Sequence, residues 1–319
     1  MRPDPTLRVS RRKYWSVPVA VAVAVAALLV LGLSDSSSSA QAQETTSATL
    51  VGAGDIASCT SKGDTATAKL LGSIEGTVLA MGDNAYTEGS LSQYNDCYGP
   101  TWGRYKARTM PVVGNHEYRT EGASGYFDYF GAAAGESGKG YYSYNQGAWH
   151  IVALNSECKY WATGFKDGPS QCSSQQQADM IAWLKADLAA NPTACTLAYF
   201  HQPRFSSGFG GNALETQPIW DALYAAKADV VLSGHDHIYE RFARQTPNGT
   251  LDERGIREFV VGTGGVDHGG IGTIKANSQV RNTTTYGVLK LTLNATSYSW
   301  KFVPVAGKTF TDSGTTSCN

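Results

Sequence analysis

The chain has 319 residues, of which 26 are Lys or Arg and 27 are Asp or Glu, so its formal net charge at pH 7 is −1. This balance excludes a strongly basic surface of the kind that binds nucleic acids or other polyanions. The length and the 42% hydrophobic content are sufficient for one large domain with a substantial core.

Residues 1–42 are typical of a removable export signal. A basic segment at residues 8–13 precedes an apolar run over residues 17–33, and Ala40-Gln41-Ala42 provides a small-x-small cleavage pattern. The segment SRRKYW also resembles a twin-arginine signal. The apolar run has about 17 residues, the lower limit for crossing a bilayer, so an uncleaved anchor is the less favoured alternative. We therefore expect a secreted protein without stable membrane insertion.

Cleavage after Ala42 leaves residues 43–319 as a single predicted catalytic domain. Because the removed segment holds five basic and two acidic residues, the remaining 277 residues carry a net charge of −4. No segment within them has the composition of a linker.

Five short apolar runs of this domain each end at a polar turn. They lie at residues 48–57, 77–86, 110–118, 195–205 and 229–237. Continuous apolar runs bounded by turns are typical of strands that are buried on both faces.

Amphipathic segments lie between some of these predicted strands. A helix is expected from Asp64, which we interpret as its N-cap, to Gly76; others are expected over 174–190 and 214–228. After residue 255 the pattern changes to short strand-like runs. The order of elements predicts an α/β fold, in which ligands bind beyond the carboxyl ends of the strands.

The polar turns carry residues that are typical metal ligands. Their side chains are carboxylates, imidazoles and one amide, from Asp55, Asp83, Asn115, His201, His235 and His237. This donor set suits a borderline or hard cation. One carboxylate, Asp83 or Asp55, could bridge two ions about 3.5 Å apart, an arrangement that supports phosphoryl displacement.

Five motifs in order resemble those of calcineurin-like metallophosphoesterases. They are Gly54-Asp55, Gly82-Asp83-Asn84-Ala85-Tyr86, Gly114-Asn115-His116-Glu117, His201 and Gly234-His235-Asp236-His237. Tyr86, three residues after Asp83, and the segment Tyr239-Glu240-Arg241 resemble the purple acid phosphatase branch, in its small single-domain form.

This resemblance implies a sandwich of two mixed β-sheets flanked by helices. It also implies that Asp55, Tyr86 and His237 hold one metal ion, that Asn115, His201 and His235 hold a second, and that Asp83 bridges them. The implied pair is Fe(III) with a divalent ion (Zn, Fe or Mn), because tyrosinate is a hard anionic ligand. The implied reaction is hydrolysis of a small phosphate monoester by a metal-bound hydroxide. His116 is expected to act on the phosphoryl group or the leaving oxygen.

One position departs from the pattern of that branch. A further histidine usually follows about nine residues after the one that matches His201, whereas this chain has Phe209 and Gly210 there. The absence leaves a phosphodiesterase or nucleotidase of the same fold as an alternative. A non-catalytic, secreted metal-binding module is a second alternative, which the complete ligand set disfavours.

The six cysteines form an even set without a CxxC pair, which favours disulfides in an exported chain. Fifteen connectivities are possible. Our hypothesis pairs Cys59 with Cys97, Cys158 with Cys172, and Cys195 with Cys318; free buried cysteines are the alternative. Among the remaining histidines, His150 is interpreted as structural, and His268 lies in a Gly-rich turn that could face the site.

Overall fold

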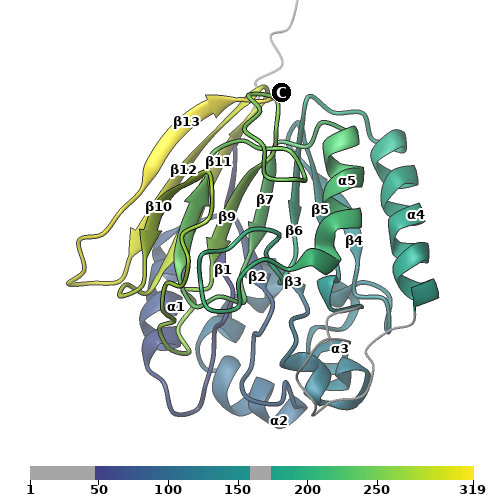
Figure 1. Cartoon of the computed structure of the whole chain (residues 1–319). Coiled ribbons are helices and arrows are strands. Elements are labelled where there is room, and N and C mark those ends of the chain that lie inside the picture. Colours follow the sequence, from purple (N-terminus) through teal and green to yellow (C-terminus); the bar gives the residue numbers. More distant parts are fainter. Residues whose placement is uncertain (1–46, 159–173) are drawn as a thin grey trace, which may run out of the picture. The chain divides into compact units, whose positions relative to one another are not determined.

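The computed structural model describes residues 47–158 and 174–319, which form two mixed β-sheets flanked by helices (Figure 1). The six-stranded sheet has the order β13-β12-β11-β1-β2-β3. Its strands are β1 (Ala48–Ala53), β2 (Thr77–Met81), β3 (Thr109–Val112), β11 (Gly287–Asn294), β12 (Ser297–Pro304) and β13 (Ser313–Ser317). β1, β2 and β3 are parallel, and β11, β12 and β13 extend the sheet in antiparallel fashion from β1.

The seven-stranded sheet has the order β10-β8-β9-β7-β6-β5-β4. Its strands are β4 (Tyr142–Gln146), β5 (Trp149–Ala153), β6 (Cys195–Tyr199), β7 (Val230–Ser233), β8 (Tyr239–Phe242), β9 (Arg257–Val261) and β10 (Ser278–Asn282). β5, β6, β7 and β9 are parallel, whereas β4, β8 and β10 pair in antiparallel fashion. The predicted fold class is therefore confirmed.

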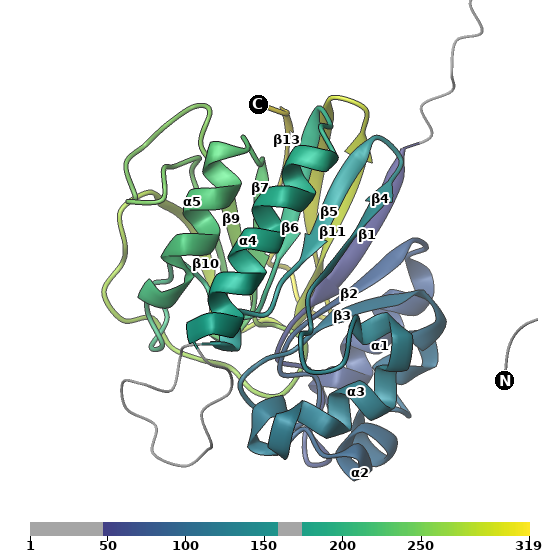
Figure 2. The same ribbon diagram turned by 90° about the vertical axis from the view of Figure 1, so that its right-hand side faces the viewer.

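Within residues 47–158 and 174–319, five α-helices lie around the sheets (Figure 2). They are α1 (Gly63–Ser73), α2 (Leu91–Gln93), α3 (Ser124–Phe130), α4 (Ser174–Ala190) and α5 (Gln217–Ala225). Figure 2 shows α4 and α5 against the seven-stranded sheet, α1 and α3 beside β2 and β3 of the other sheet, and α2 next to α3. Short 3₁₀ or π segments lie at Tyr94–Tyr98, Trp102–Arg108, Glu117–Arg119, Glu121–Ala123, Gly131–Ala134, Ser156–Cys158 and Leu214–Thr216.

Alternation along the central strands creates two buried layers. In β6, Leu197 and Tyr199 belong to the core between the two sheets, while Ala198 packs in the layer beneath α4 and α5. β5 follows the same rule, with Ile151 on the inner side and Val152 on the outer side. Successive side chains of a strand point to opposite faces, so a strand buried on both faces is apolar throughout, as its sequence predicts.

The beginning of α1 differs from the prediction. The helix starts at Gly63, so Asp64 lies inside its first turn and is not the N-cap. The Asp64 carboxylate is buried and accepts a hydrogen bond of 3.0 Å from Thr101 Oγ1. This tertiary contact takes the place of the local capping bond that the sequence suggested.

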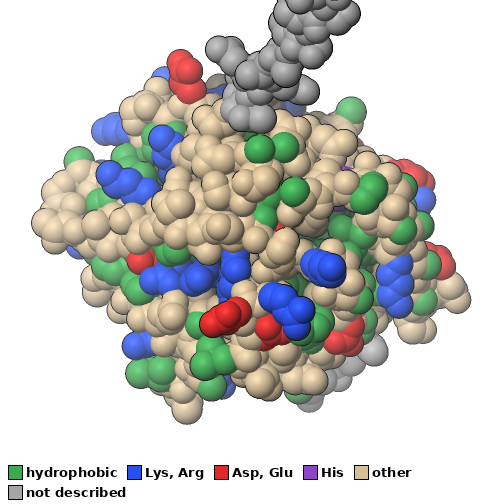
Figure 3. Space-filling view, turned by 90° about the horizontal axis from the view of Figure 1, so that it is seen from above, with side chains coloured by type: hydrophobic (Ala, Val, Ile, Leu, Met, Phe, Trp, Pro, Cys, Tyr) green, Lys and Arg blue, Asp and Glu red, His purple; other side chains and the backbone are tan. Residues whose placement is uncertain are grey.

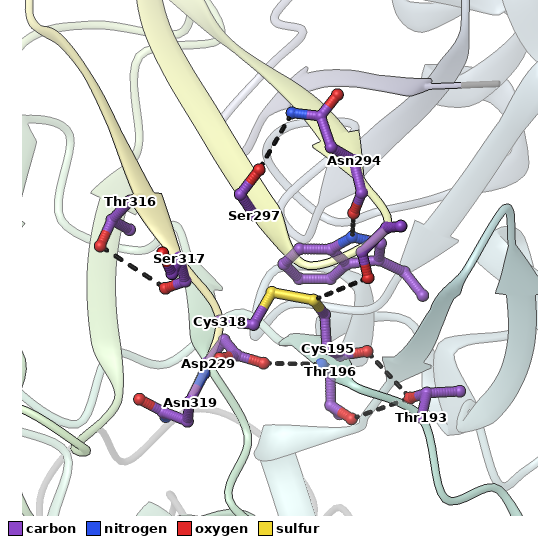
Figure 4. Close-up of a disulfide and its surroundings, with 12 residues drawn as sticks. Thr193, Cys195, Thr196, Asp229, Asn294, Ser297, Thr316, Ser317, Cys318 and Asn319 are labelled. Carbon is purple, nitrogen blue, oxygen red and sulfur yellow. Dashed lines mark hydrogen bonds between the residues drawn. A yellow bond between two sulfur atoms is a disulfide. The ribbon is translucent and has the colours of Figure 1, made fainter. Parts of the chain in front are cut away.

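Within the part of the chain that the structure describes, two disulfides join segments that are distant in the sequence. Cys59 is bonded to Cys97, and Cys195 at the start of β6 is bonded to Cys318 beside the C-terminus (Figure 4). Next to the second bridge, the carboxylate of Asp229 accepts hydrogen bonds from the backbone N–H groups of Thr196 (2.8 Å) and Asn319 (2.6 Å). Both pairings match the hypothesis; the third predicted pair, Cys158–Cys172, includes Cys172, which lies outside the described residues.

The described surface shows little segregation of charge on the face seen in Figure 3. There, Lys and Arg side chains lie in small groups among acidic and uncharged ones. No helix within residues 47–158 and 174–319 is both long and apolar enough to cross a membrane. The predicted export signal lies outside these residues.

Candidate metal centre

The seven predicted ligands all lie in turns that follow strands of the two sheets. Asp55 follows β1, Asp83 and Tyr86 follow β2, and Asn115 follows β3 of the six-stranded sheet; His201 follows β6, and His235 and His237 follow β7 of the other sheet. The structure brings all seven together at one edge of the sandwich.

Glycines in these turns allow the two sheets to approach closely. Asp55, Asp83 and His235 have positive φ angles of 60°, 49° and 69°, a conformation that is uncommon for residues other than glycine and clusters at functional sites. A Cβ on the neighbouring Gly82 would lie 2.5 Å from Nδ1 of His201. The absence of a side chain there is therefore required for the imidazole to reach the turn after β2.

Tyr86 is at the middle of the first group of ligands. Its hydroxyl oxygen lies 2.9 Å from Oδ1 of Asp55 and 3.1 Å from Nε2 of His237. His237 Nε2 is in turn 3.2 Å from Oδ1 of Asp55. Three potential ligand atoms thus surround one point.

Asn115 is at the middle of the second group. Its Oδ1 atom lies 3.2 Å from Nε2 of His201 and 3.0 Å from Nδ1 of His235. Within the described residues, ligand atoms of Asp83, His201 and His235 all lie within 4.8 Å of one another.

Asp83 connects the two groups. Its Oδ2 atom is 3.0 Å from the Tyr86 hydroxyl and 3.2 Å from Nε2 of His201. The other oxygen, Oδ1, accepts a hydrogen bond of 2.8 Å from the backbone N–H of His116. One carboxylate oxygen therefore faces both groups at once.

These contacts cannot all be hydrogen bonds between neutral groups. His201 Nδ1 lies 2.9 Å from the carbonyl oxygen of Met81 and donates to it, so in the neutral imidazole Nε2 carries a lone pair. That lone pair faces Oδ1 of Asn115 and Oδ2 of Asp83, which are both acceptors. A cation at the centre would satisfy these converging lone pairs. Ligand atoms that are each held about 2.1 Å from one ion lie about 3 Å from one another, which is close to the separations found here. The donor set fits bound metal.

The pKa values show the same demand for positive charge. Burial opposes ionisation of Asp83, yet the imidazoles of His201 and His116 outweigh burial and lower the pKa of this carboxyl. Burial disfavours protonated His237, but the charge of Asp55 and hydrogen bonds to Asp55 and Asp267 raise its pKa to about 9. Burial and the Asp55 and Asp83 charges raise the pKa of Tyr86, so the phenolate requires a nearby cation.

The pKa of His235 is shifted in the opposite direction from the pKa values of His201 and His237. Burial, followed by the charge of His201, lowers its pKa to about 4. In contrast, Asp83 keeps the pKa of His201 above its usual value despite burial. Metal ligands must be deprotonated, and His235 already meets this condition at neutral pH.

Two carboxylates that the sequence analysis did not select support the ligands. Glu117 is fully buried, and its oxygens accept backbone hydrogen bonds from Asp83 (2.9 Å), Asn84 (2.8 Å) and Gly114 (2.7 Å). Burial, followed by the charge of Asp83, raises the pKa of Glu117 to about 8. Asp267 accepts a short hydrogen bond from Nδ1 of His237, which directs Nε2 of that ring toward Asp55. The signal for Glu117 was its position two residues after Asn115 in the GNHE motif.

His116 lies beside the ligands but not among them. Its Nδ1 atom donates to the carbonyl oxygen of Thr87 at 2.7 Å, and its ring packs against that of Tyr86 at 4.2 Å. Its Nε2 atom is 3.8 Å from Oδ2 of Asp83, beyond hydrogen-bonding distance. The partly exposed ring is therefore placed at the solvent side of the cluster.

The two other histidines have no place in the cluster. His150 is buried between Asn145 and Asp187, with nitrogen–oxygen distances of 2.8 and 2.7 Å, which confirms a structural role. His268 stacks on Tyr286 with ring centroids 3.9 Å apart. Its neighbour Asp267, rather than His268, contacts the site.

Comparison with known proteins agrees with this geometry. Residues 50–239 match the family model of the calcineurin-like phosphoesterases. Purple acid phosphatase 23 of Arabidopsis thaliana is 34% identical over 184 residues, which cover 51% of this chain and only 37% of the plant protein. The chain thus matches well under half the length of that relative.

Two solved structures share the fold. The yellow lupin purple acid phosphatase PPD1 superposes with a TM-score of 0.66 at 18% identity, covering 85% of this chain and 54% of the lupin chain. GAP50, described as the anchor in the inner membrane complex of Plasmodium, also has a TM-score of 0.66, at 16% identity, and covers 86% of this chain and 89% of its own. The family match spans more than half of the chain and includes all seven converging side chains, so this protein belongs to the calcineurin-like phosphoesterase family.

Proposed function

We propose that this protein is an exported phosphatase that hydrolyses phosphate monoesters at a centre of two metal ions. The observation that carries the proposal is the position of Asp83 Oδ2, 3.0 Å from the Tyr86 hydroxyl and 3.2 Å from His201 Nε2. A single carboxylate oxygen between two groups of donors is the expected arrangement for a bridging ligand. The purple acid phosphatases among its relatives support the same reaction.

The seven side chains divide into two ligand sets that share Asp83. Asp55, Tyr86 and His237 would hold one ion, and Asn115, His201 and His235 the other. When bound, the two ions supply Lewis acidity to the phosphate oxygens and lower the pKa of a water molecule. For the Tyr86 side we propose ferric iron, because only a strongly charged ion compensates for the two carboxylates that raise the pKa of this phenol. A divalent ion (Zn, Fe or Mn) would occupy the other side.

The protein's own groups fix the orientation of the ligands. The Met81 carbonyl and the Asp267 carboxylate hold Nδ1 of His201 and His237, respectively, so that the Nε2 atoms of both rings face inward. Such partners fix the tautomer of a metal-binding histidine and raise its affinity for the ion.

His116 is the proposed general acid. Because its Nδ1–H is bound to the Thr87 carbonyl, Nε2 is the atom that can exchange a proton with the substrate. This atom lies on the open side of the cluster, next to Asp83. Transfer of a proton from Nε2 to the leaving oxygen would complete cleavage of the P–O bond.

The test is to measure metal content together with hydrolysis of p-nitrophenyl phosphate before and after chelation. We expect two metal equivalents per chain, loss of activity when they are removed, and recovery when they are restored. Metal-loaded protein that hydrolyses no phosphate ester would instead identify a metal-binding module without catalysis.

A diesterase is the second candidate, and one observation favours it. The turn that carries Phe209 and Gly210 lacks the further histidine, and a Cβ on Gly210 would already lie 3.1 Å from Nε2 of His235. Gly210 itself has no side chain that could form a hydrogen bond to the oxygens of a monoester. Comparing bis(p-nitrophenyl) phosphate with p-nitrophenyl phosphate separates the two activities.

Export is proposed from the features of residues 1–42 and from the disulfides. Cys59–Cys97 and Cys195–Cys318 are typical of proteins from oxidising compartments. Under this proposal residues 43–319 form the mature catalytic domain, and its substrate is a small phosphate ester. N-terminal sequencing of the secreted protein would test cleavage after Ala42.

A further inference from the structure

The loop that follows β6 places an exposed aromatic ring beside the candidate metal centre. Phe209 has 79% of its surface exposed, the largest fraction among the exposed large hydrophobic side chains of the described residues. The next residue, Gly210, runs against His235, since a Cβ there would lie 3.1 Å from both Cδ2 and Nε2 of the imidazole. Phe209 is therefore adjacent in the sequence to a residue, Gly210, that lies against the proposed ligand His235.

A second segment places the same ring near His237. A Cβ on Gly270 would lie 2.4 Å from the Phe209 ring, so the ring rests on the backbone of that glycine. The adjacent Gly269 donates a hydrogen bond of 2.8 Å from its backbone N–H to the carbonyl oxygen of His237. The ring of Phe209 thus lies at the rim of the centre. Its own segment contacts His235 through Gly210, and the segment beneath it contacts His237 through Gly269.

The loop that carries Phe209 is held by three buried carboxylates. Asp236 accepts a hydrogen bond of 2.7 Å from the N–H of Gly210, and Glu240 accepts one of 2.7 Å from the N–H of Ser207. Glu258 accepts hydrogen bonds of 2.9 and 3.0 Å from the backbone N–H groups of Arg204 and Phe205. These hydrogen bonds hold the backbone on both sides of Phe209 in place before any substrate arrives.

Phe209 is the only aromatic residue among the exposed large hydrophobic side chains of the described residues, and it lies beside the candidate centre. Leu91, Leu214, Leu251 and Ile274 are the other large examples, and all of them are aliphatic. A ring that is fixed in place loses little entropy when a second ring stacks on it. The environment of Phe209 favours a stacking surface.

We propose that Phe209 determines substrate specificity by stacking on an aromatic group of the phosphate ester. The inference rests on the proposed function, since it places the phosphate of the same molecule at the centre formed by Asp83 and the histidines. Stacking on one aromatic side chain changes affinity by about tenfold or more. The substrate class is thus a phosphate ester with a nucleobase or another aromatic ring close to the phosphate.

The experiment compares adenosine 5′-phosphate with ribose 5-phosphate, which differ only in the base. Metal-loaded wild type, Phe209→Ala and Phe209→Tyr are assayed for kcat/KM, with Leu214→Ala as a control for loss of an exposed hydrophobic side chain from the 3₁₀ segment that follows this loop. Binding is measured separately by calorimetry with the hydrolysis-resistant phosphonates of the two compounds, so the readout does not require turnover. Phenyl phosphate and methyl phosphate form a second pair, which distinguishes a simple aromatic ring from a nucleobase.

We expect the wild type to prefer the aromatic member of at least one pair by about tenfold, through KM and affinity. Phe209→Ala should abolish this preference, while Phe209→Tyr and Leu214→Ala retain it. Equal use of both members of each pair, or a preference that survives in Phe209→Ala, overturns the inference while hydrolysis itself upholds the proposed function. If no ester is hydrolysed but the phosphonates still show the Phe209-dependent preference, the proposed function fails and the stacking role stands.

Discussion

Oδ2 of Asp83 lies 3.2 Å from Nε2 of His201, although the carboxylate follows β2 of one sheet and the imidazole follows β6 of the other. The candidate centre is therefore formed across the two layers of the sandwich.

Replacing Asp83 with Asn should remove both metal ions together. The amide is neutral and supplies one oxygen, so it cannot serve both donor groups with a shared negative charge. We expect activity to fall by about 100-fold or more and the content of both metals to decrease, as measured by elemental analysis. Asp96→Asn, at an exposed carboxylate, is the control; unchanged metal content in Asp83→Asn would contradict the bridging role.

Replacing His116 with Ala should leave the metals in place and slow turnover. The ring contacts Tyr86 and the Thr87 carbonyl but stands 3.8 Å from Asp83. Removing a general acid should lower kcat by about 10²–10⁴-fold without a change in metal content. His268→Ala removes an exposed histidine that stacks on Tyr286 and should have little effect. Loss of metal from His116→Ala as readily as from Asp83→Asn would show that His116 is a ligand.

Tyr86 should determine whether the iron-loaded protein is coloured. Tyrosinate bound to ferric iron gives a visible charge-transfer band, so the wild type should be purple and Tyr86→Phe colourless. The substitution nearly preserves the volume of the ring, and the fold should be retained. Absorption spectra and thermal unfolding of both proteins check this, with Tyr105→Phe as the control. A colourless wild type with two divalent ions would refute the ferric assignment, and a coloured Tyr86→Phe would exclude Tyr86 as a ligand.

The Cys195–Cys318 bridge should stabilise the fold without affecting the centre. It joins residues 123 positions apart and holds the C-terminus against the start of β6. Replacing both cysteines with Ala should lower the free energy of unfolding by about 2–5 kcal/mol, measured by urea denaturation, with the metal content unchanged. Alkylation of the unreduced, unfolded wild type should add no mass at these cysteines; a modified Cys195 or Cys318 would disprove the bridge.

Glu258 should make the protein less stable as the pH rises. Burial raises the pKa of this carboxyl to about 8 from 4.5. Between these values the folded state holds a proton that the unfolded state has released, so the free energy of unfolding falls with increasing pH, by up to about 1.4 kcal/mol per pH unit.

Glu258→Gln should therefore show a shallower decline than the wild type when urea midpoints are compared between pH 5 and pH 8. Other buried carboxylates contribute equally to both proteins, and their effect cancels in the difference. Glu121→Gln, at an exposed position, should decline like the wild type. Identical slopes for Glu258→Gln and the wild type would contradict the prediction.

The sequence predicted the strands and the convergence of the ligands because both follow from local patterns. Apolar runs such as that of β7 are long enough to identify buried strands, and the polar residue at each end marks the same edge of a sheet. The residues that support the ligands were not predicted. Asp267 lies 30 positions after His237, and nothing in its neighbourhood indicates which histidine it would contact.

The failure at Asp64 has a similar origin. Its position before a helical segment is typical of an N-cap, but the structure uses its carboxylate for a contact with Thr101, 37 positions away. The carboxylates that hold the loop after β6 were missed for the same reason, since Asp236 follows β7, and Glu240 and Glu258 lie in β8 and β9. Long-range contacts of single polar side chains leave no periodic pattern in a sequence.

Glu117 affects how the candidate centre assembles, because it joins two of the ligand-bearing turns. By binding the backbone of Asp83, Asn84 and Gly114, this carboxylate ties the turn after β2 to the turn after β3 through protein atoms alone. These two ligand-bearing turns are thus held together without a cation. Under the proposed function, different ions could exchange at one folded scaffold, and the metal supply around the folded protein, rather than the folding pathway, would decide which pair of ions it carries.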